Sequence, residues 1–157
     1  MVRIAVGSFI IGFAMQTFAC ALGSFDFRTR NLYIDARNGI DPAPMVEAAL
    51  EWNRVCHKPL WKVIDDPGDA DVIFSVRREA GAQQGHKICG LAGLYGSGDL
   101  YMGDSVCSDY YYEVAAHELG HSLGLEHTDG GLMNPSVDVD GSWPDAADLR
   151  AKGWDCP

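Results

Sequence analysis

The sequence predicts a single α+β domain, and three observations support this fold class. The chain has 157 residues, of which 47% are hydrophobic and 22% charged, as is typical of one folded domain. Segments with strand-like and helix-like patterns follow one another in mixed order. We find no internal repeat and no low-complexity tail, so a solenoid or a disordered chain is not expected.

The first half of the mature sequence predicts three strands and one helix. Residues 31–36 alternate enough to form the first strand. Asp41 and Pro42 resemble a helix cap and a first helical position, and apolar residues then recur at helical spacing up to Cys56. Residues 60–64 and 71–76 predict two more strands, the second of them apolar enough to be central, with a turn at residues 65–68.

The second half predicts bent strands followed by two helices. Seven glycines lie between residues 81 and 103, interleaved with apolar residues, which indicates short strands and close turns. Asp109 is a plausible N-cap for a helix over residues 110–123. A final helix is expected from about Pro144 to Lys152, capped by Ser142.

Residues 1–21 predict a signal peptide. Arg3 is the first and only charge before Asp26, residues 4–18 are largely apolar, and small residues flank Cys20. The apolar run is short for a membrane-spanning helix; an uncleaved anchor is the alternative, and a lipid-modified Cys20 is a lesser one. Residues 22–157 then form the mature domain, secreted from the cell or, in a bacterium, exported to the periplasm.

Export makes disulfides the expected state of the cysteines. The mature chain keeps an even number of them, and sequence alone permits three pairings. We favour Cys89–Cys107, which would close the glycine-rich loop, and Cys56–Cys156, which would tie the C-terminus to the first helix. The sequence has no C-x-x-C pair, so a cysteine zinc site is not expected.

The charge of the chain limits its partners. The formal net charge is −10, which would repel nucleic acid and favours solubility outside the cell. We expect a monomer with no membrane association after signal cleavage.

The stretch AAHELGHSLGLEHTDGGLMNP, residues 115–135, holds three of the five histidines. His117 and His121 are four residues apart, so on a helix both imidazoles reach one ion. Glu118 is turned by about 100° from His117 and lies beside that ion. Gly124 allows the helix to end and the chain to return with His127. Three imidazoles that leave one tetrahedral position open are typical of catalytic zinc.

This string resembles the signature of the metzincin metalloproteases, HExxHxxGxxH followed by a Met-turn. Met133, in Leu-Met-Asn-Pro, lies where the Met-turn would fall, and the resemblance implies that it packs beneath the histidines. ALEWNRV, ADVIFSV and Met-x-Pro are similar to matrixins in particular. The resemblance implies a zincin domain with a twisted, mostly parallel sheet, an antiparallel edge strand, an active-site helix, the Met-turn and a C-terminal helix.

The resemblance also implies a function, a zinc-dependent endopeptidase with one catalytic Zn²⁺ on the three histidines. Glu118 would act as the general base on the attacking water. A protein or peptide substrate would extend beside an edge strand at about residues 94–102, with its main pocket walled by residues 134–139. Asp138 and Asp140 either bias this pocket toward basic residues or are solvated loop acids.

Two alternative interpretations remain open. An exported module with the metzincin fold could bind a ligand without catalysis. In a thermolysin-like arrangement, Asp145 or Asp148 would supply the third ligand and leave His127 unexplained.

Two further metal sites can be considered. Matrixins usually hold a second, structural zinc with several histidines, but His86 is the sole candidate in the strand region, so we expect that site to be missing. We expect His86 and His57 to be solvated. Asp99, Asp104 and Asp109 are candidate calcium ligands.

Overall fold

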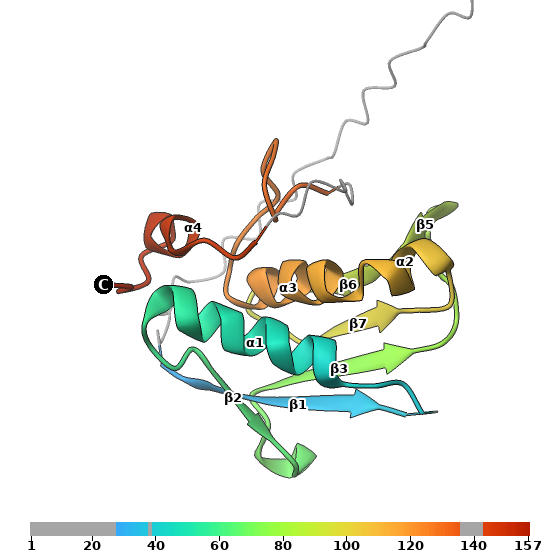
Figure 1. Cartoon of the computed structure of the whole chain (residues 1–157), viewed down its shortest axis with the longest axis horizontal. Helices are drawn as coiled ribbons and strands as arrows, with labels where there is room; N and C mark the ends of the chain where they lie inside the picture. The colour runs from blue at the N-terminus through green and yellow to red at the C-terminus, as the bar shows by residue number, and fades with distance from the viewer. Residues whose placement is uncertain (1–27, 38, 136–142) are drawn as a thin grey trace, which may run out of the picture.

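The strands form one mixed sheet in the computed structural model, which describes residues 28–37, 39–135 and 143–157 (Figure 1). The sheet order is β2-β1-β3-β7-β6, and only the pairing of β6 with β7 is antiparallel within it. These strands are β1 (Arg30–Ala36), β2 (Trp61–Ile64), β3 (Val72–Arg77), β6 (Gly90–Ala92) and β7 (Gly98–Tyr101). The predicted α+β fold, mostly parallel with an antiparallel edge strand, is confirmed.

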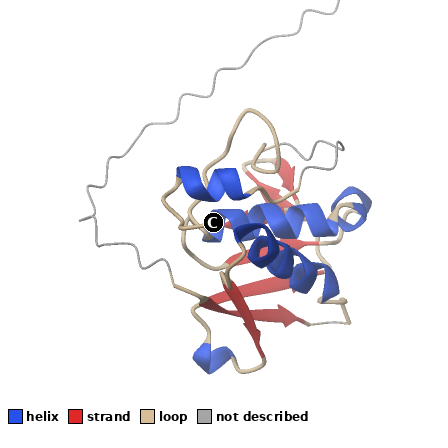
Figure 2. Ribbon diagram, turned by 60° about the vertical axis from the view of Figure 1, so that its left-hand side comes forward, coloured by secondary structure: helices blue, strands red, loops and turns tan. Residues whose placement is uncertain are grey.

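Two long helices cover one face of this sheet. They are α1 (Ala43–Cys56) and α3 (Tyr111–Ser122), which lie side by side and in contact (Figures 1 and 2). The smaller elements are a 3₁₀ turn (Pro67–Asp69), the hairpin β4 (Gly81–Gln83) with β5 (His86–Ile88), α2 (Ser105–Asp109) and α4 (Ala146–Ala151). No helix within the described ranges is long and apolar enough to cross a membrane.

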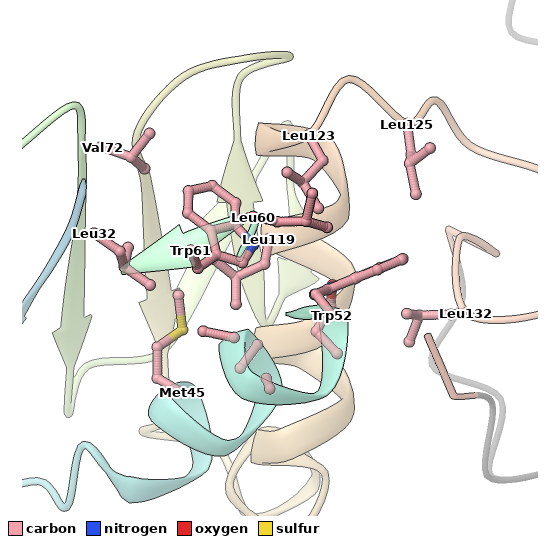
Figure 3. Close-up of a cluster of buried hydrophobic side chains, with 14 of the residues drawn as sticks. Leu32, Met45, Trp52, Leu60, Trp61, Val72, Leu119, Leu123, Leu125 and Leu132 are labelled. Atoms are coloured by element: carbon pink, nitrogen blue, oxygen red, sulfur yellow. The ribbon is translucent and has the colours of Figure 1, made fainter. Parts of the chain in front are cut away.

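The core lies between the sheet and the two long helices. Along β3, Val72, Phe74 and Val76 are buried while Ile73 is exposed, so one strand face points toward the helices. Trp52 of α1 is fully buried in this cluster of apolar side chains (Figure 3). Its indole Nε1–H donates to the carbonyl of Ala116 at 3.0 Å. This bond fixes α1 against α3. Each fully buried large apolar side chain of the core contributes about 1.5–3 kcal/mol to the free energy of unfolding.

The first helix starts one residue later than the sequence predicts. Pro42 is the N-cap rather than the first helical residue, and the helix begins at Ala43. The Asp41 carboxylate still accepts from the Ala43 N–H at 2.9 Å, so the capping interaction exists in a different register. Element ends are set by such local bonds, which sequence patterns locate only approximately.

The predicted helix over residues 110–123 is present as α3 (Tyr111–Ser122), within one residue at each end, but the predicted Asp109 cap was wrong. Asp104 accepts from the Val106 N–H at 3.0 Å and starts α2 earlier, and Asp109 is the last residue of that helix. Tyr110 then leaves helical geometry, with φ −109° and ψ 28°, before α3 begins. The break separates a short helix held by Cys107 from the helix that carries the histidines.

Two more predictions need correction. The last helix begins at Ala146, where the Asp145 carboxylate accepts from the Ala147 N–H, instead of at Pro144; Ser142 lies outside the described residues. The two edges of the sheet are β2 and β6, whereas the predicted edge at residues 94–102 contains β7, which pairs on both sides. The signal peptide predicted for residues 1–21 also lies outside the described residues and remains a prediction.

Both favoured disulfides are present in the structure. Cys56–Cys156 joins the end of α1 to the C-terminal segment across 100 residues of chain, and Cys89–Cys107 joins the segment between β5 and β6 to α2 across 18 residues. The first closes almost the whole domain, and the second anchors the edge strand to the helical layer.

We predict that loss of Cys56–Cys156 destabilises the domain more than loss of Cys89–Cys107. The loop-entropy model gives about 4.7 kcal/mol for a loop of about 100 residues and about 3 kcal/mol for one of about 15. Urea unfolding of the paired serine variants, Cys56→Ser with Cys156→Ser and Cys89→Ser with Cys107→Ser, measures both losses. Equal losses would contradict the ranking.

Candidate active site

A cleft of about 740 Å³ runs between the sheet edge and α3. One wall is formed by Gly90, Leu91 and Ala92 of β6, and the opposite side by residues of α3 and by part of the segment 126–135 that follows it. His117, Glu118, His121 and His127 all line this cleft. The structure therefore brings the histidines and Glu118 together at a surface that a substrate can reach.

The three histidines form one cluster. One ligand nitrogen from each lies within 4.8 Å of the others, and this is the group of metal-ligating type found in the described part of the chain. His121 and His127 approach with their Nε2 atoms 3.1 Å apart. His117 is half-buried, His121 is buried and His127 is exposed, so the cluster faces the cleft from the helix side.

Backbone carbonyls fix the tautomers of the two helical histidines. The Nδ1 of His117 lies 2.7 Å from the Leu132 oxygen, and the Nδ1 of His121 lies 2.7 Å from the Leu125 oxygen. A carbonyl oxygen only accepts, so each Nδ1 carries the proton and each Nε2 presents a lone pair. Burial lowers the pKa of His117 to about 4 and also lowers that of His121, which keeps both rings neutral near pH 7.

This arrangement fits a zinc ion. The Nε2 atoms of His121 and His127 lie 3.1 Å apart. Tetrahedral zinc with Zn–N bonds of about 2.0–2.1 Å places its ligand nitrogens about 3.3 Å apart. Zinc prefers neutral imidazoles whose other ring nitrogen donates to a carbonyl or a carboxylate, as both helical histidines do here.

The turn after α3 places His127. Gly124 has φ +91°, its N–H donates to the His121 oxygen at 2.8 Å, and the Leu125 N–H donates to the Gly120 oxygen at 3.0 Å. These two bonds define a Schellman motif, which ends the helix and reverses the chain. The same reversal aims the Leu125 carbonyl at the Nδ1 of His121.

Tyr95 holds this turn from outside. Its N–H donates to the His121 oxygen at 3.0 Å, and its ring lies so close to Gly124 that a Cβ atom there would overlap it. Arg30 of β1 donates to the oxygens of Ser122 (2.6 Å) and Tyr95 (2.8 Å). The C-terminal end of α3 is therefore tied to both β1 and the loop between β6 and β7.

Glu118 is buried beside the histidines. Burial raises its pKa to about 8, and the opposing hydrogen bond from the Ala92 backbone lowers it only in part. Its Oε2 atom has no hydrogen-bond partner within the described residues. An unpartnered buried carboxylate oxygen at a cleft is costly and points to a ligand or water that completes it.

Gly90 makes room for this carboxylate. A Cβ atom at Gly90 would overlap Oε1 of Glu118 and lie 2.6 Å from its Cγ. The edge strand can therefore approach the helix only because position 90 has no side chain. Sequence patterns singled out the glycine-rich region, but no signal in it distinguishes Gly90 from its neighbours.

Met133 packs under the helix. It is 1% exposed, and its sulfur would lie 2.6 Å from a Cβ at Gly120, directly beneath the turn between the two helical histidines. The Met133 carbonyl accepts from the Thr128 N–H at 3.0 Å, which ties the segment after His127 back on itself. The resemblance implies a position for Met133 beneath the three histidines, and its contact with Gly120 on the same helix is consistent with that prediction.

Other candidate residues lie away from the cluster. His86 is exposed in β5, and His57 is the exposed left-handed C-cap of α1. Asp99 bonds Arg77 at 2.9 Å, and Asp104 bonds Lys87 at 2.8 Å while capping α2, so neither carboxylate is directed at a cation site. Calcium is not supported by these contacts.

The predicted substrate pocket and the alternative zinc ligands can be placed only in part. Asn134 and Pro135 line the cleft, whereas Asp138, Val139 and Asp140 lie outside the described residues. Asp145 caps α4, and neither it nor Asp148 belongs to the metal-ligating group. The thermolysin-like arrangement is therefore not the one found.

The sequence did not identify the groups that position the site. These are the carbonyls of Leu125 and Leu132, Gly90 and Ala92 of β6, and Tyr95 with Arg30 around the Schellman turn. All of them contact the site through hydrogen bonds to backbone atoms or through close packing between separate elements. A pattern of residues along the sequence does not show such contacts.

A mixed sheet whose antiparallel edge faces a helix with two of three clustered histidines defines a zincin-type peptidase domain. Known proteins agree with this class. The family model described as Matrixin matches residues 51–148, which include the whole cluster. The chain belongs to the matrixin family of metzincin zinc metallopeptidases.

Two relatives show the extent of the similarity. Interstitial collagenase of Bos taurus is 36% identical over 135 residues, which cover 73% of this chain and 28% of the collagenase. The chain thus spans under a third of that relative. The crystal structure of archaemetzincin from Methanopyrus kandleri has a TM-score of 0.62 at 16% identity, covering 78% of this chain and 93% of that one, and shows the shared fold.

We predict that Gly124→Ala lowers both stability and zinc retention. A left-handed backbone costs about 1–2 kcal/mol for an L-residue, and the new methyl group also collides with Tyr95. Gly85→Ala is the matched control, since Gly85 has φ +82° and a methyl group added there would have nothing within 4 Å. Thermal unfolding and zinc content measure the difference, and equal behaviour of the two variants would contradict this account.

We predict that Gly90→Ala reduces activity more than stability. The methyl group would displace the Glu118 carboxylate, and a shift of about 1 Å costs roughly 100-fold in rate. Gly93→Ala, with open space at that position, is the control. Steady-state hydrolysis of a peptide and thermal unfolding are compared, and full activity of Gly90→Ala would rule out the close approach.

Proposed function

We propose that this domain is a zinc-dependent endopeptidase that hydrolyses peptide bonds within polypeptide substrates. The observation that carries the proposal is the convergence of three imidazoles on one point beside a buried carboxylate, in a cleft bordered by a sheet edge. Membership of the matrixin family supports the same reaction class.

His117, His121 and His127 would hold the zinc through their Nε2 atoms. The fixed tautomers of the first two supply lone pairs toward the cluster, and the Schellman turn supplies the third. Zinc, when bound, would polarise the scissile carbonyl and bring the pKa of a bound water to about 7.

Glu118 would move the proton. Its Oε2 has no partner among the described residues, and Glu118 lines the cleft. A cation held by the neighbouring histidines would favour the ionised carboxylate over the protonated form, and the carboxylate could then accept a proton from the attacking water. As the water oxygen bonds to the carbonyl carbon and the C–N bond breaks, Glu118 would pass the proton to the leaving amine. Its oxygen Oε1 lies against Gly90, where a side chain would overlap it.

An extended substrate would lie along β6. This strand bonds β7 on one side only, and its other side borders the cleft next to Glu118. Main-chain hydrogen bonds to a sheet edge bind a polypeptide without demanding a particular sequence. This placement replaces the edge at residues 94–102 that the sequence predicts.

We also propose that the protein works after export. Two disulfides are typical of chains that fold in an oxidising compartment, and residues 1–21 have the pattern of a signal peptide. Edman sequencing of the mature protein from its host would start near residue 22 if this proposal is correct.

We predict that Glu118→Gln removes hydrolysis and keeps the metal, whereas His127→Ala loses both. General acid–base catalysis contributes about 10²–10⁴-fold, so Glu118→Gln should cut casein hydrolysis by at least about 100-fold at unchanged zinc content. A chelator should abolish wild-type activity and zinc should restore it. His86→Ala is the control, because His86 is exposed outside the cleft.

Two results would overturn the mechanism. Activity that survives the chelator or Glu118→Gln would remove the zinc and the base from the reaction. Stoichiometric zinc without turnover of any polypeptide would instead favour a binding module with the metzincin fold.

A further inference from the structure

A second groove lies next to the cleft, over the junction of α1 and α3. Its apolar lining consists of Leu50, Tyr112 and Trp143, and its volume is about 630 Å³. The rings of Tyr112 and Trp143 are in contact, with centroids 5.3 Å apart at an angle of 50°. Leu50 is 56% exposed and Trp143 61%, more than the other large apolar side chains of the described residues. Contiguous exposed apolar surface of this kind is typical of a binding site.

The charges around this groove are unbalanced. Glu51 is compensated, because it accepts from the Arg54 guanidinium at 2.7 Å. Glu47 and Glu113 have no ion pair or side-chain hydrogen bond with any described residue, so the groove carries two uncompensated carboxylates. Burial, followed by the charges of Glu51, Glu113 and Glu47, raises the pKa of the Tyr112 hydroxyl to about 12. The groove therefore favours a positively charged partner.

Glu113 connects the groove to the catalytic cleft. It lines both of them, and it lies one helical turn before His117 on the same side of α3. A polypeptide in the cleft that continues past His117 toward the start of α3 enters the groove at this residue. The groove and the cleft can therefore hold parts of one chain.

We propose that this groove binds a second segment of the substrate polypeptide, one that carries a lysine or arginine side chain and lies outside the residues around the scissile bond. The cation would lie over Trp143 and pair with Glu47 or Glu113, while its aliphatic stem packs on Leu50 and the rings. The inference rests on the proposed peptidase function and adds to it a preference for basic polypeptides.

The test compares peptides of two lengths. The short peptide fills only the cleft. Each long peptide adds a six-residue extension with two lysines, at the N-terminus in one peptide and at the C-terminus in another. A matched pair of peptides carries glutamates in place of the lysines. We expect wild-type kcat/KM for one lysine-extended peptide to exceed that for the short peptide by roughly tenfold, mainly through KM, since an exposed cation–π contact and ion pair together give about this factor. The glutamate extensions should give no gain.

Variants then locate the effect. Trp143→Ala should remove most of the gain and Glu47→Gln part of it, because Glu113 still pairs with the cation. Both variants should leave the short peptide within twofold of wild type. Val106→Ala, an exposed apolar residue of α2, and Asp65→Asn, an exposed acid after β2, are the matched controls and should keep the gain. Glu113 is not varied, because it also lines the cleft.

Binding is measured separately from turnover. Fluorescence anisotropy of the lysine-extended peptide on Glu118→Gln, with and without Trp143→Ala, should show a Kd ratio of roughly tenfold. This readout distinguishes failure of the groove from failure of the peptidase, which would appear as no cleavage even of the short peptide.

Three results would overturn the proposal. One is an equal kcat/KM and Kd for all extensions. Another is a Trp143→Ala variant that unfolds at lower temperature while it keeps the discrimination, which would make Trp143 a packing residue. The third is a dimer in solution that Trp143→Ala dissociates, which would assign the groove to a second copy of the chain.

Discussion

The end of α3 at Gly124 is the constraint on which the site depends. A continued helix would direct residue 127 away from His117 and His121, because six residues rotate the side chain far around the axis. The Schellman bonds reverse the chain at this point and give His121 its carbonyl partner at Leu125. Arg30 and Tyr95 then hold this turn against the sheet. The same turn therefore determines both the position of the His127 ring and the tautomer of His121.

The second determinant is the distance between the sheet edge and the helix. Glu118 lies against β6, where Gly90 leaves space for it and the Ala92 N–H binds it. This contact places the carboxylate between the histidines and the strand along which a substrate would lie. The same edge that binds a polypeptide therefore also confines the group proposed to act on it.

Packing beneath the active-site helix and cross-links between elements support these contacts. Met133 fills the space under Gly120, and a larger residue at position 120 would push the methionine out of the turn below the histidines. Trp52 holds α1 to α3 through the Ala116 carbonyl, and the two disulfides tie the chain end and the edge strand to the helical layer. Rigid packing around the cluster keeps its ligand atoms close together before any ion binds.

The sequence left three disulfide pairings open, of which the favoured one is present in the structure. By itself it determined the fold class, most of the strands and helices within a few residues, and the histidine cluster. These follow from local spacing, since residues four apart share a helix face and glycine permits a left-handed turn. Only the tertiary structure decided that α2 is separate from α3, that β6 is an edge strand, and that Gly90, Tyr95 and two leucine carbonyls position the site. Those features arise where backbone segments that are distant in the sequence approach one another. The side chains along one segment do not indicate which other segment its backbone will contact.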